Sequence, residues 1–298
     1  MRHRFVRRAA ALSAALFASA LIHSAAAAEG EPSTVIDAEY AFAASAQPLG
    51  VRGAFLKYLS NDAIICSPAP VNGIASTAAG KPNKDSLEWY PTYSQTAASA
   101  DLGYTTGPWT YRSADGKGEA HGTFLSVWRK QPDGSWRVAL DCGISHPKFD
   151  APPQGLKASA TGTTTGAAAA DAESTGNWKD PVAAAESRFT TAAARGAAAA
   201  FKQFAAADSR VLIRGSQPAV GPAAGEALVA AQKLGSTWQQ VFASESLDGT
   251  LGYAWGYIGE AGAEKPTAVY VNIWRRAKVG APWQIAAQSV QILPTKKA

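Results

Sequence analysis

The sequence is poor in the residues that build several common kinds of functional site. Its 298 residues include two cysteines, four histidines and one methionine. Two of the histidines lie within the first 28 residues and no C-x-x-C pair occurs, so we expect no zinc site, no other metal and no cofactor. The patterns G-x-S-x-G, H-E-x-x-H and G-x-G-x-x-G are also missing. Their absence removes the signatures of serine hydrolases, zinc proteases and dinucleotide-dependent enzymes.

An excess of charge of one sign is missing as well. The chain has 28 basic and 23 acidic residues, but four of the arginines fall within the first 28 residues. Without that segment, 24 basic residues face 23 acidic ones. This balance gives no basis for binding to nucleic acid or to an anionic membrane, and we predict neither partner.

Long apolar runs are limited to the N-terminal segment. Met1–Arg8 is basic, Ala9–Ile22 is apolar over 14 residues, and Ala26–Ala28 fits the A-x-A cleavage pattern before Glu29. The run is shorter than the ~20 residues that a membrane helix needs. We therefore predict a signal peptide over residues 1–28 and a periplasmic or secreted mature protein, with an uncleaved anchor as the alternative.

The two cysteines, Cys66 and Cys142, allow two interpretations. An oxidising compartment permits a disulfide between them. Two buried thiols acting as small apolar side chains would fit the same sequence. The sequence leaves both open.

The rest of the chain repeats itself. Gly50–Asp62 matches Gly196–Asp208 in its pattern, and the triplets Leu102-Gly-Tyr and Val127-Trp-Arg recur as Leu251-Gly-Tyr and Ile273-Trp-Arg. Residues shared by both copies indicate an architectural role, and we expect Asp62 and Asp208 to bond local backbone. An Ala/Thr/Gly/Pro-rich stretch separates the copies and is typical of a flexible linker. The predicted organisation is a first domain over 29–148, a linker over 149–179, and a second, more diverged domain over 180–298.

Each copy carries the pattern of helices followed by an antiparallel sheet, which indicates an α+β fold. In the first copy the predicted helices cover 38–46, 53–60 and 84–89, and the predicted strands cover 63–66, 102–106, 122–129 and 136–144. The turn Gln131–Ser135 contains Pro-Asp-Gly and predicts a hairpin.

Both faces of the strand at 123–129 are mostly apolar. Thr123, Leu125 and Val127 share one face; Phe124, Ser126 and Trp128 share the other. A strand with one solvated face would show polar residues there, so both faces should be covered. One face should pack on the copy's own helices, and the other on the second copy or on another chain. We therefore predict pairing of the two domains within the chain or a homodimer.

Two segments, Asp101–Trp109 and Val127–Val138, resemble the SnoaL-like branch of the nuclear-transport-factor-2-like (NTF2-like) superfamily. The similarity is closest to secreted members classed as a domain of unknown function. It covers Asp37–Pro147 and, more loosely, Pro181–Pro294. It implies two tandem cone-shaped units, each a curved antiparallel sheet wrapped around N-terminal helices, with a pocket at the mouth. The superfamily includes a ketosteroid isomerase, dehydratases, polyketide cyclases and non-catalytic binding or assembly modules, so the fold alone names no activity.

Residues found in only one copy are the sharper candidates for chemistry. Asp141 stands where the second copy has Gln288, and His121 where it has Thr267. In the superfamily's enzymes a carboxylate or histidine in the cone acts as acid or base. An apolar cone would raise the pKa of a carboxylate and suit it to proton transfer. Alternatively, Asp141 pairs with an arginine of a neighbouring strand and has only a structural role.

Aromatic and polar residues of the strands could line the pocket or fill the core. The candidates are Tyr104, Trp109, Ser126, Trp128, Tyr253, Trp255, Asn272 and Trp274.

Three functions fit these observations. The first, which we favour, is binding of a small apolar or aromatic molecule. The second is a lyase-, isomerase- or cyclase-type enzyme that uses Asp141 or His121 in the first domain. The third is a non-catalytic assembly module without a pocket.

Overall fold

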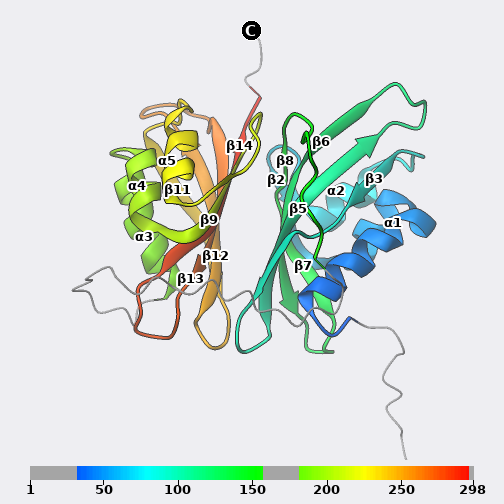
Figure 1. Cartoon of the computed structure of the whole chain (residues 1–298), viewed down its shortest axis with the longest axis horizontal. Coiled ribbons are helices and arrows are strands. Elements are labelled where there is room, and N and C mark those ends of the chain that lie inside the picture. Colours follow the sequence, from blue (N-terminus) through cyan, green and yellow to red (C-terminus); the bar gives the residue numbers. More distant parts are fainter. Residues whose placement is uncertain (1–31, 157–180, 295–298) are drawn as a thin grey trace, which may run out of the picture. The chain divides into compact units, whose positions relative to one another are not determined.

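Each half of the described chain begins with helices and continues into a β-sheet (Figure 1). The computed structural model describes residues 32–156 and 181–294. The predicted signal peptide and most of the predicted linker lie outside these ranges, so both stay predictions. The first half contains α1 (Val35–Tyr58), β1 (Leu59–Cys66), β2 (Pro70–Asn72), α2 (Gly73–Ala79), β3 (Ser86–Trp89), β4 (Tyr93–Thr96), β5 (Leu102–Arg112), β6 (Glu119–Lys130), β7 (Trp136–Asp141) and β8 (Ile144–Ser145).

The second half follows the same plan. It contains α3 (Val182–Ala193), α4 (Ala197–Phe204), β9 (Ala205–Ile213), β10 (Ala219–Val220), α5 (Pro222–Ala230), β11 (Thr237–Glu245), β12 (Leu251–Gly259), β13 (Ala268–Arg275) and β14 (Gln284–Ile292). Among the described residues, no helix is long and apolar enough to cross a membrane.

Helix α1 is two helices joined at a kink. Thr34 caps its N-terminus by accepting a hydrogen bond from the backbone N–H of Asp37 at 3.1 Å. Gly50 interrupts the helix with φ 70°, a left-handed conformation that glycine adopts without strain. The break separates the two helical segments that the sequence predicts.

The two sheets have matching strand orders. The first runs β2-β1-β7-β6-β5-β3, with β4 also paired to β5 and β8 to β6; the second runs β10-β9-β14-β13-β12-β11. Neighbouring strands are antiparallel except for β1 with β7 and β9 with β14, which are parallel. The predicted α+β class is confirmed, and the sheets are mixed rather than wholly antiparallel. The parallel pairs arise because the first strand of each half inserts beside the last long strand, β7 in the first half and β14 in the second.

One predicted element is wrong in kind. Residues 84–89 do not form a short helix; Ser86–Trp89 is the strand β3, which pairs with β5 through Trp89 and Trp109. Cross-strand packing of these large side chains outweighs the weak helical preference of the segment. The hairpin turn is confirmed, since Gly134 has φ 85° and its N–H donates to the carbonyl of Gln131 at 2.9 Å.

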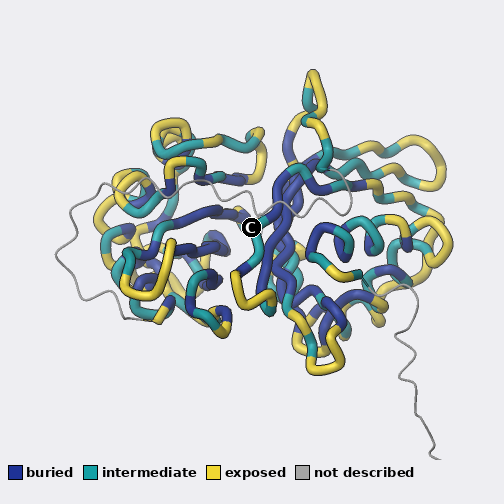
Figure 2. Tube along the Cα trace, turned by 60° about the horizontal axis from the view of Figure 1, so that its bottom comes forward, coloured by how far each residue is buried: buried dark blue, intermediate teal, exposed yellow. Residues whose placement is uncertain are grey.

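Apolar side chains form three cores, and buried segments follow the strands (Figure 2). One core lies between α1 and the first sheet and includes Phe42 and Trp128. A second lies between α3, α4 and the second sheet. The third joins the other faces of both sheets and includes Leu125, Val127 and Ile273. Both faces of the central strands of each sheet are therefore covered, and the two halves pair within the chain.

Reciprocal contacts between loops support this pairing. The Asp101 carboxylate accepts a hydrogen bond from the N–H of Leu247 at 3.0 Å, and the Asp248 carboxylate accepts one from the N–H of Ser99 at 2.9 Å. The described residues after Pro32 belong to one compact unit.

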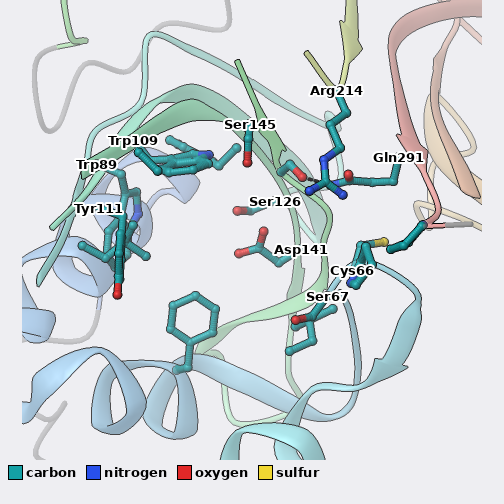
Figure 3. Close-up of a pocket in the computed structure, with 18 residues that line it drawn as sticks. Cys66, Ser67, Trp89, Trp109, Tyr111, Ser126, Asp141, Ser145, Arg214 and Gln291 are labelled. Carbon is teal, nitrogen blue, oxygen red and sulfur yellow. Dashed lines mark hydrogen bonds between the residues drawn. The ribbon is translucent and has the colours of Figure 1, made fainter. Parts of the chain in front are cut away.

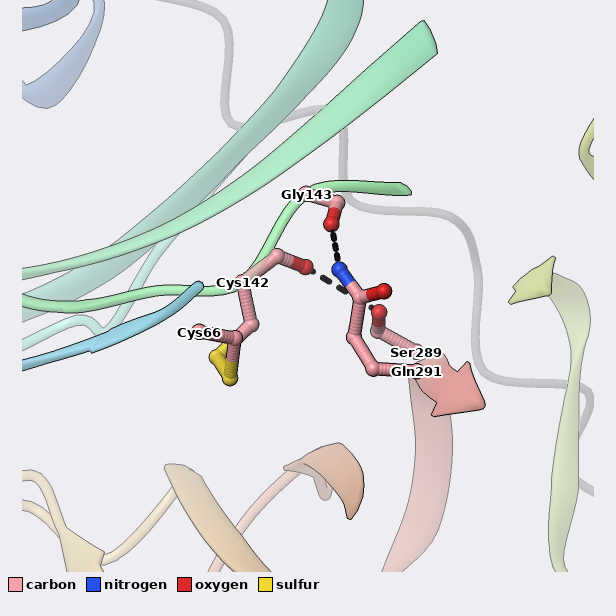
Figure 4. Close-up of a disulfide and its surroundings, with 5 residues drawn as sticks. All are labelled: Cys66, Cys142, Gly143, Ser289 and Gln291. Atoms are coloured by element: carbon pink, nitrogen blue, oxygen red, sulfur yellow. Dashed lines mark hydrogen bonds between the residues drawn. A yellow bond between two sulfur atoms is a disulfide. The ribbon is translucent and has the colours of Figure 1, made fainter. Parts of the chain in front are cut away.

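Cys66 and Cys142 form a disulfide with a Cα–Cα distance of 4.7 Å, one of the two alternatives that the sequence left open (Figure 4). It ties the end of β1 to the residue after β7. Strand β14 contacts the same place: Ser289 Oγ donates to the Cys142 carbonyl at 3.1 Å, and Gln291 Nε2 donates to the Gly143 carbonyl. The disulfide thus lies where the two halves meet.

Candidate functional site

The first half contains a cavity of about 560 Å³ between its helices and its sheet (Figure 3). Its volume lies within the range of small-molecule sites, about 300–1,000 Å³. The lining residues are Phe55, Ile65, Cys66, Ser67, Pro68, Leu87, Trp89, Trp109, Tyr111, Ala120, Phe124, Ser126, Asp141, Gly143, Ser145, Arg214, Gln291 and Pro294.

Aromatic side chains form one wall of the cavity, where Trp89, Trp109 and Tyr111 lie together in Figure 3. Strand pairing places them, because Trp89 lies opposite Trp109 in the β3–β5 ladder. Gly122 on β6 leaves room for the Trp109 indole, since a Cβ at this position would overlap its ring. Such a wall suits a flat apolar or aromatic molecule.

Among the described residues that line this cavity, Asp141 is the only acidic one. It lies on β7 opposite Ser126 of β6. Its carboxylate keeps some accessible surface because it faces the cavity (Figure 3). Partial removal of the carboxylate from water, with repulsion from Glu39, raises the pKa of Asp141 to about 7. The nearby Ser126 hydroxyl lowers the pKa of Asp141 and so opposes this rise. The buried Ser126 Oγ itself has no hydrogen-bond partner of ordinary geometry.

A second carboxylate, Glu39 of α1, is fully buried in the first half. It accepts hydrogen bonds from Trp89 Nε1 at 2.6 Å, Thr105 Oγ1 at 2.6 Å and Trp128 Nε1 at 2.9 Å. Desolvation raises its pKa, and these hydrogen bonds oppose the rise. With its oxygens occupied, Glu39 anchors the helix to the sheet and holds the Trp89 indole in place.

His121 lies away from Asp141. Its Nδ1 is 3.1 Å from Thr110 Oγ1 and its Nε2 is 2.7 Å from Glu119 Oε1. His121 and Ser126 are five residues apart on β6, so their side chains leave opposite faces of the strand. His121 borders a separate cavity of about 220 Å³. The two candidate acid–base residues are therefore not brought together.

The predicted pocket residues fall into three groups. Trp109 and Ser126 line the large cavity. Tyr104 and Tyr253 belong to the core between the two sheets, and the partly buried Trp255 packs against that core. Trp128, Trp274 and Asn272 are fully buried and donate hydrogen bonds to Glu39 or Glu186.

In the second half, buried side chains occupy the positions that match the inner wall of the cavity. Glu186 of α3 accepts hydrogen bonds from Trp274 Nε1 at 2.7 Å and from Asn272 Nδ2 at 3.1 Å, and desolvation raises its pKa to about 7. Gln288 Nε2 donates to Asn272 Oδ1 at 2.9 Å. Asn272, Trp274 and Gln288 are all fully buried. The pair Asn272–Gln288 occupies the positions that Ser126 and Asp141 occupy in the first half.

Several cavity residues were not predicted from the sequence. Trp89 and Tyr111 sit on strands whose inward face the pattern did not define. Arg214 and Gln291 come from the second half, and no pattern along the chain signals that they approach a cavity in the first.

Comparisons with known proteins bear on the fold. No protein-family model matches the chain, and no curated protein matches it. Among solved structures, a ketosteroid isomerase-like protein from Erwinia carotovora atroseptica SCRI1043 is 18% identical, covers 37% of this chain and 93% of its own, and has a TM-score of 0.30. An NTF-2 like protein of unknown function from Shewanella oneidensis MR-1 is 16% identical, covers 36% of this chain and 89% of its own, and has a TM-score of 0.28. The S. rosetta CaMKII hub is 15% identical, covers 38% of this chain and 98% of its own, and has a TM-score of 0.31.

The names printed for these structures include NTF-2 like and ketosteroid isomerase-like. These names agree with the superfamily resemblance seen in the sequence, and each match covers a length close to one of the two halves. At such identities the likeness concerns the fold and not the reaction. The assignment to the SnoaL-like branch stays a prediction. In the first half, the cavity lies between α1 and the sheet. We call this half the first unit and the other the second unit.

Proposed function

We propose that the first unit binds a small planar aromatic molecule, with Asp141 as a polar anchor on the inner wall. The observation that carries this proposal is a single cavity combining an aromatic wall of Trp89, Trp109 and Tyr111 with one carboxylate. Most of the lining is apolar, and few polar groups converge on the space, which is typical of small-molecule sites.

Titration with 2-naphthol tests this proposal. Binding is measured by the quenching of tryptophan fluorescence and by calorimetry. Ser145 is exposed at the edge of the cavity, so Ser145→Trp should fill the space without disturbing the buried core. We expect the wild type and Ser145→Ala to bind the probe, and Ser145→Trp to lose binding by at least about tenfold. Equal affinity in all three proteins would place the probe elsewhere and overturn the proposal.

A second candidate function is proton transfer, which the pKa of Asp141 favours. A carboxylate with a pKa of about 7 in an apolar cavity is a stronger base than an ordinary aspartate, and it is ionised in half of the molecules at that pH. It would take a proton from a carbon next to a carbonyl group and return it to the same or another position.

Deuterium exchange at the carbon next to the carbonyl of 2-tetralone, followed by NMR in D₂O, tests this candidate. Catalysis by Asp141 requires a rate that rises with pH up to about 7 and then levels off, and that falls by about a hundredfold or more in Asp141→Asn. An exchange rate equal to that of buffer alone would leave binding as the function.

The assembly function has less support, because the outer faces of both sheets already cover each other. We propose an oxidising compartment, periplasmic or extracellular, as the place of action, and the Cys66–Cys142 disulfide supports it. The intact mass of protein secreted by a bacterial host, measured with and without reduction, tests both points. We expect a mature chain that starts at Glu29. Treated with an alkylating agent, it should take up two alkyl groups only after reduction.

A further inference from the structure

The second unit supplies part of the cavity in the first unit. Arg214, which follows β9, and Gln291 and Pro294, at the end of β14, line the same space as Asp141. Figure 3 shows Arg214 and Gln291 on the side opposite Trp89 and Tyr111, with Asp141 between the two groups. The cavity is therefore a joint product of both units.

The backbone around Arg214 is fixed by contacts with both units. Ser216 N–H donates to the Ile213 carbonyl at 3.0 Å, and Gly215 has φ 93°, so the chain makes a tight turn directly after Arg214. Arg214 N–H donates to the carbonyl of Val290 in its own sheet at 3.2 Å. Gly215 N–H donates to the carbonyl of Ser145 in the first unit at 2.8 Å. The base of the arginine side chain is thus held at the edge of the cavity.

The guanidinium of Arg214 has no acidic partner among the residues that the structure describes. The side chain is exposed, and none of the ion pairs within residues 32–156 and 181–294 includes it. By contrast, Arg129 and Arg275 are both paired with aspartates. Arg214 is therefore a cation at the cavity edge whose hydrogen-bond donors are available to a ligand.

Gln291 strengthens this edge. It is 6% exposed, and its amide donates to the carbonyl of Gly143, two residues beyond Asp141. The wall that carries Asp141 and the edge that carries Arg214 are therefore joined. A flat molecule that contacts the aromatic wall and directs an anionic group away from Asp141 would meet the guanidinium.

We propose that the cavity selects planar aromatic carboxylates, and that Arg214 of the second unit binds their carboxylate group. This inference rests on the proposed function, since it names the ligand class of the same cavity. A guanidinium can donate two parallel hydrogen bonds to a carboxylate, a geometry that favours this group over a neutral amide.

The test compares 2-naphthoate with its neutral counterpart 2-naphthamide, by calorimetry at pH 6, where the Asp141 carboxyl is mostly uncharged. Arg214→Gln removes the charge, and Arg214→Lys keeps it. Arg195→Gln is the matched control, because Arg195 is also exposed but does not line the cavity. We expect Arg214→Gln to weaken naphthoate binding by about fivefold and to leave naphthamide binding unchanged. Arg214→Lys should retain part of the preference, and Arg195→Gln all of it.

The outcomes separate the two proposals. If naphthamide and naphthoate both bind and Ser145→Trp blocks them, but Arg214→Gln leaves their affinity ratio unchanged, the role of Arg214 is overturned and the binding function stands. If neither probe binds to the wild type, the proposed function fails first. Added NaCl gives an independent check, since it should weaken naphthoate binding in the wild type and have little effect in Arg214→Gln.

Discussion

The interiors of the two units differ at a few positions with large consequences. In the first unit, the short side chain of Ser126 leaves space beside Asp141, and the carboxylate faces a cavity. In the second, Asn272 and Gln288 fill the same positions and bond to each other. Both units keep a buried glutamate on the first long helix, bonded to a tryptophan of the sheet. The glutamate–tryptophan contact therefore belongs to the fold, whereas the cavity depends on how much space the strand residues leave.

Removing the disulfide, which only the first unit has, should cost the most stability. Its cysteines are 76 residues apart, and a loop of this length stabilises a protein by about 4 kcal/mol in the chain-entropy model. Cys66→Ala combined with Cys142→Ala should lower the free energy of unfolding by about this amount in urea titrations. Leu212 and Ser289, which pair in the second sheet, hold the matching places without a covalent link. Reducing agent should destabilise the wild type and leave the double variant unchanged; an equal effect on both would contradict the prediction.

The next effect concerns the buried carboxylate of the second unit. The folded-state pKa of Glu186 is about 7, above the ordinary value of 4.5. The stability tied to its protonated form is therefore complete below pH 4.5 and is lost as the pH rises through 7. We expect Glu186 to account for about 3 kcal/mol of a fall in unfolding free energy between pH 4.5 and 8.

Glu186→Gln should remove this part of the fall, since the amide oxygen can still accept a hydrogen bond. Asp141 and Glu39 shift in the same direction, so some dependence on pH remains. The exposed Glu260→Gln is the control, and a pH profile of Glu186→Gln that overlays the wild type would refute the assignment.

A smaller effect separates two equivalent ion pairs. Arg129–Asp62 has side-chain exposures of 34% and 66%, whereas Arg275–Asp208 has 7% and 33%. Water screens the first pair, so Arg129→Ala should cost less than about 1 kcal/mol. Arg275→Ala leaves the carboxylate of Asp208 unpaired in a less exposed position, so it should lower the free energy of unfolding by about 2–3 kcal/mol. The two variants control for each other in urea titrations, and equal costs would show that burial does not distinguish the pairs.

A double substitution that makes the interior of the first unit more like that of the second should have the smallest effect. Ser126→Asn combined with Asp141→Gln gives the first unit the polar pair of the second. The larger amides should occupy part of the cavity and weaken 2-naphthol binding by about tenfold, or about 1.4 kcal/mol. Ser126→Ala leaves the space open and should change affinity by less than about twofold. Full binding in the double variant would mean that these positions do not control the cavity.

Much of the fold could be predicted because the sequence contains two copies of the same pattern, which can be compared with each other. Strand alternation at 123–129 correctly indicated that both faces are covered, and the Gly134 turn was confirmed by its positive φ. The pattern failed at 84–89, where pairing with β5 decides the structure. Asp62 and Asp208 were expected to bond local backbone, but their main partners are arginines about 67 residues away in the sequence. Local sequence cannot reveal such distant partners.

The candidate site was less predictable. Asp141 stood out because the second copy lacks it, and the structure places it in the cavity. His121 stood out for the same reason, yet it leaves the opposite face of β6. Tyr104 and Tyr253 were ambiguous because an aromatic residue on a strand suits a pocket or a core equally, and only the packing of the two sheets decides. The position of Arg214 at the cavity edge also depends only on that packing, which brings the second unit against the first.

Because both units belong to one chain, the interface between them need not be symmetric as it is in a homodimer. In an isologous interface every residue must suit the same contact twice. Here the Arg210 guanidinium stacks on Tyr93 at 3.5 Å, whereas Phe242, which matches Tyr93 by strand register, is 40% exposed. Likewise, the repeat places Pro68 where the second unit has Arg214. Tethering supplies a high effective concentration of the partner, so each copy could diverge without loss of association. One copy could then specialise as the edge of its neighbour's cavity.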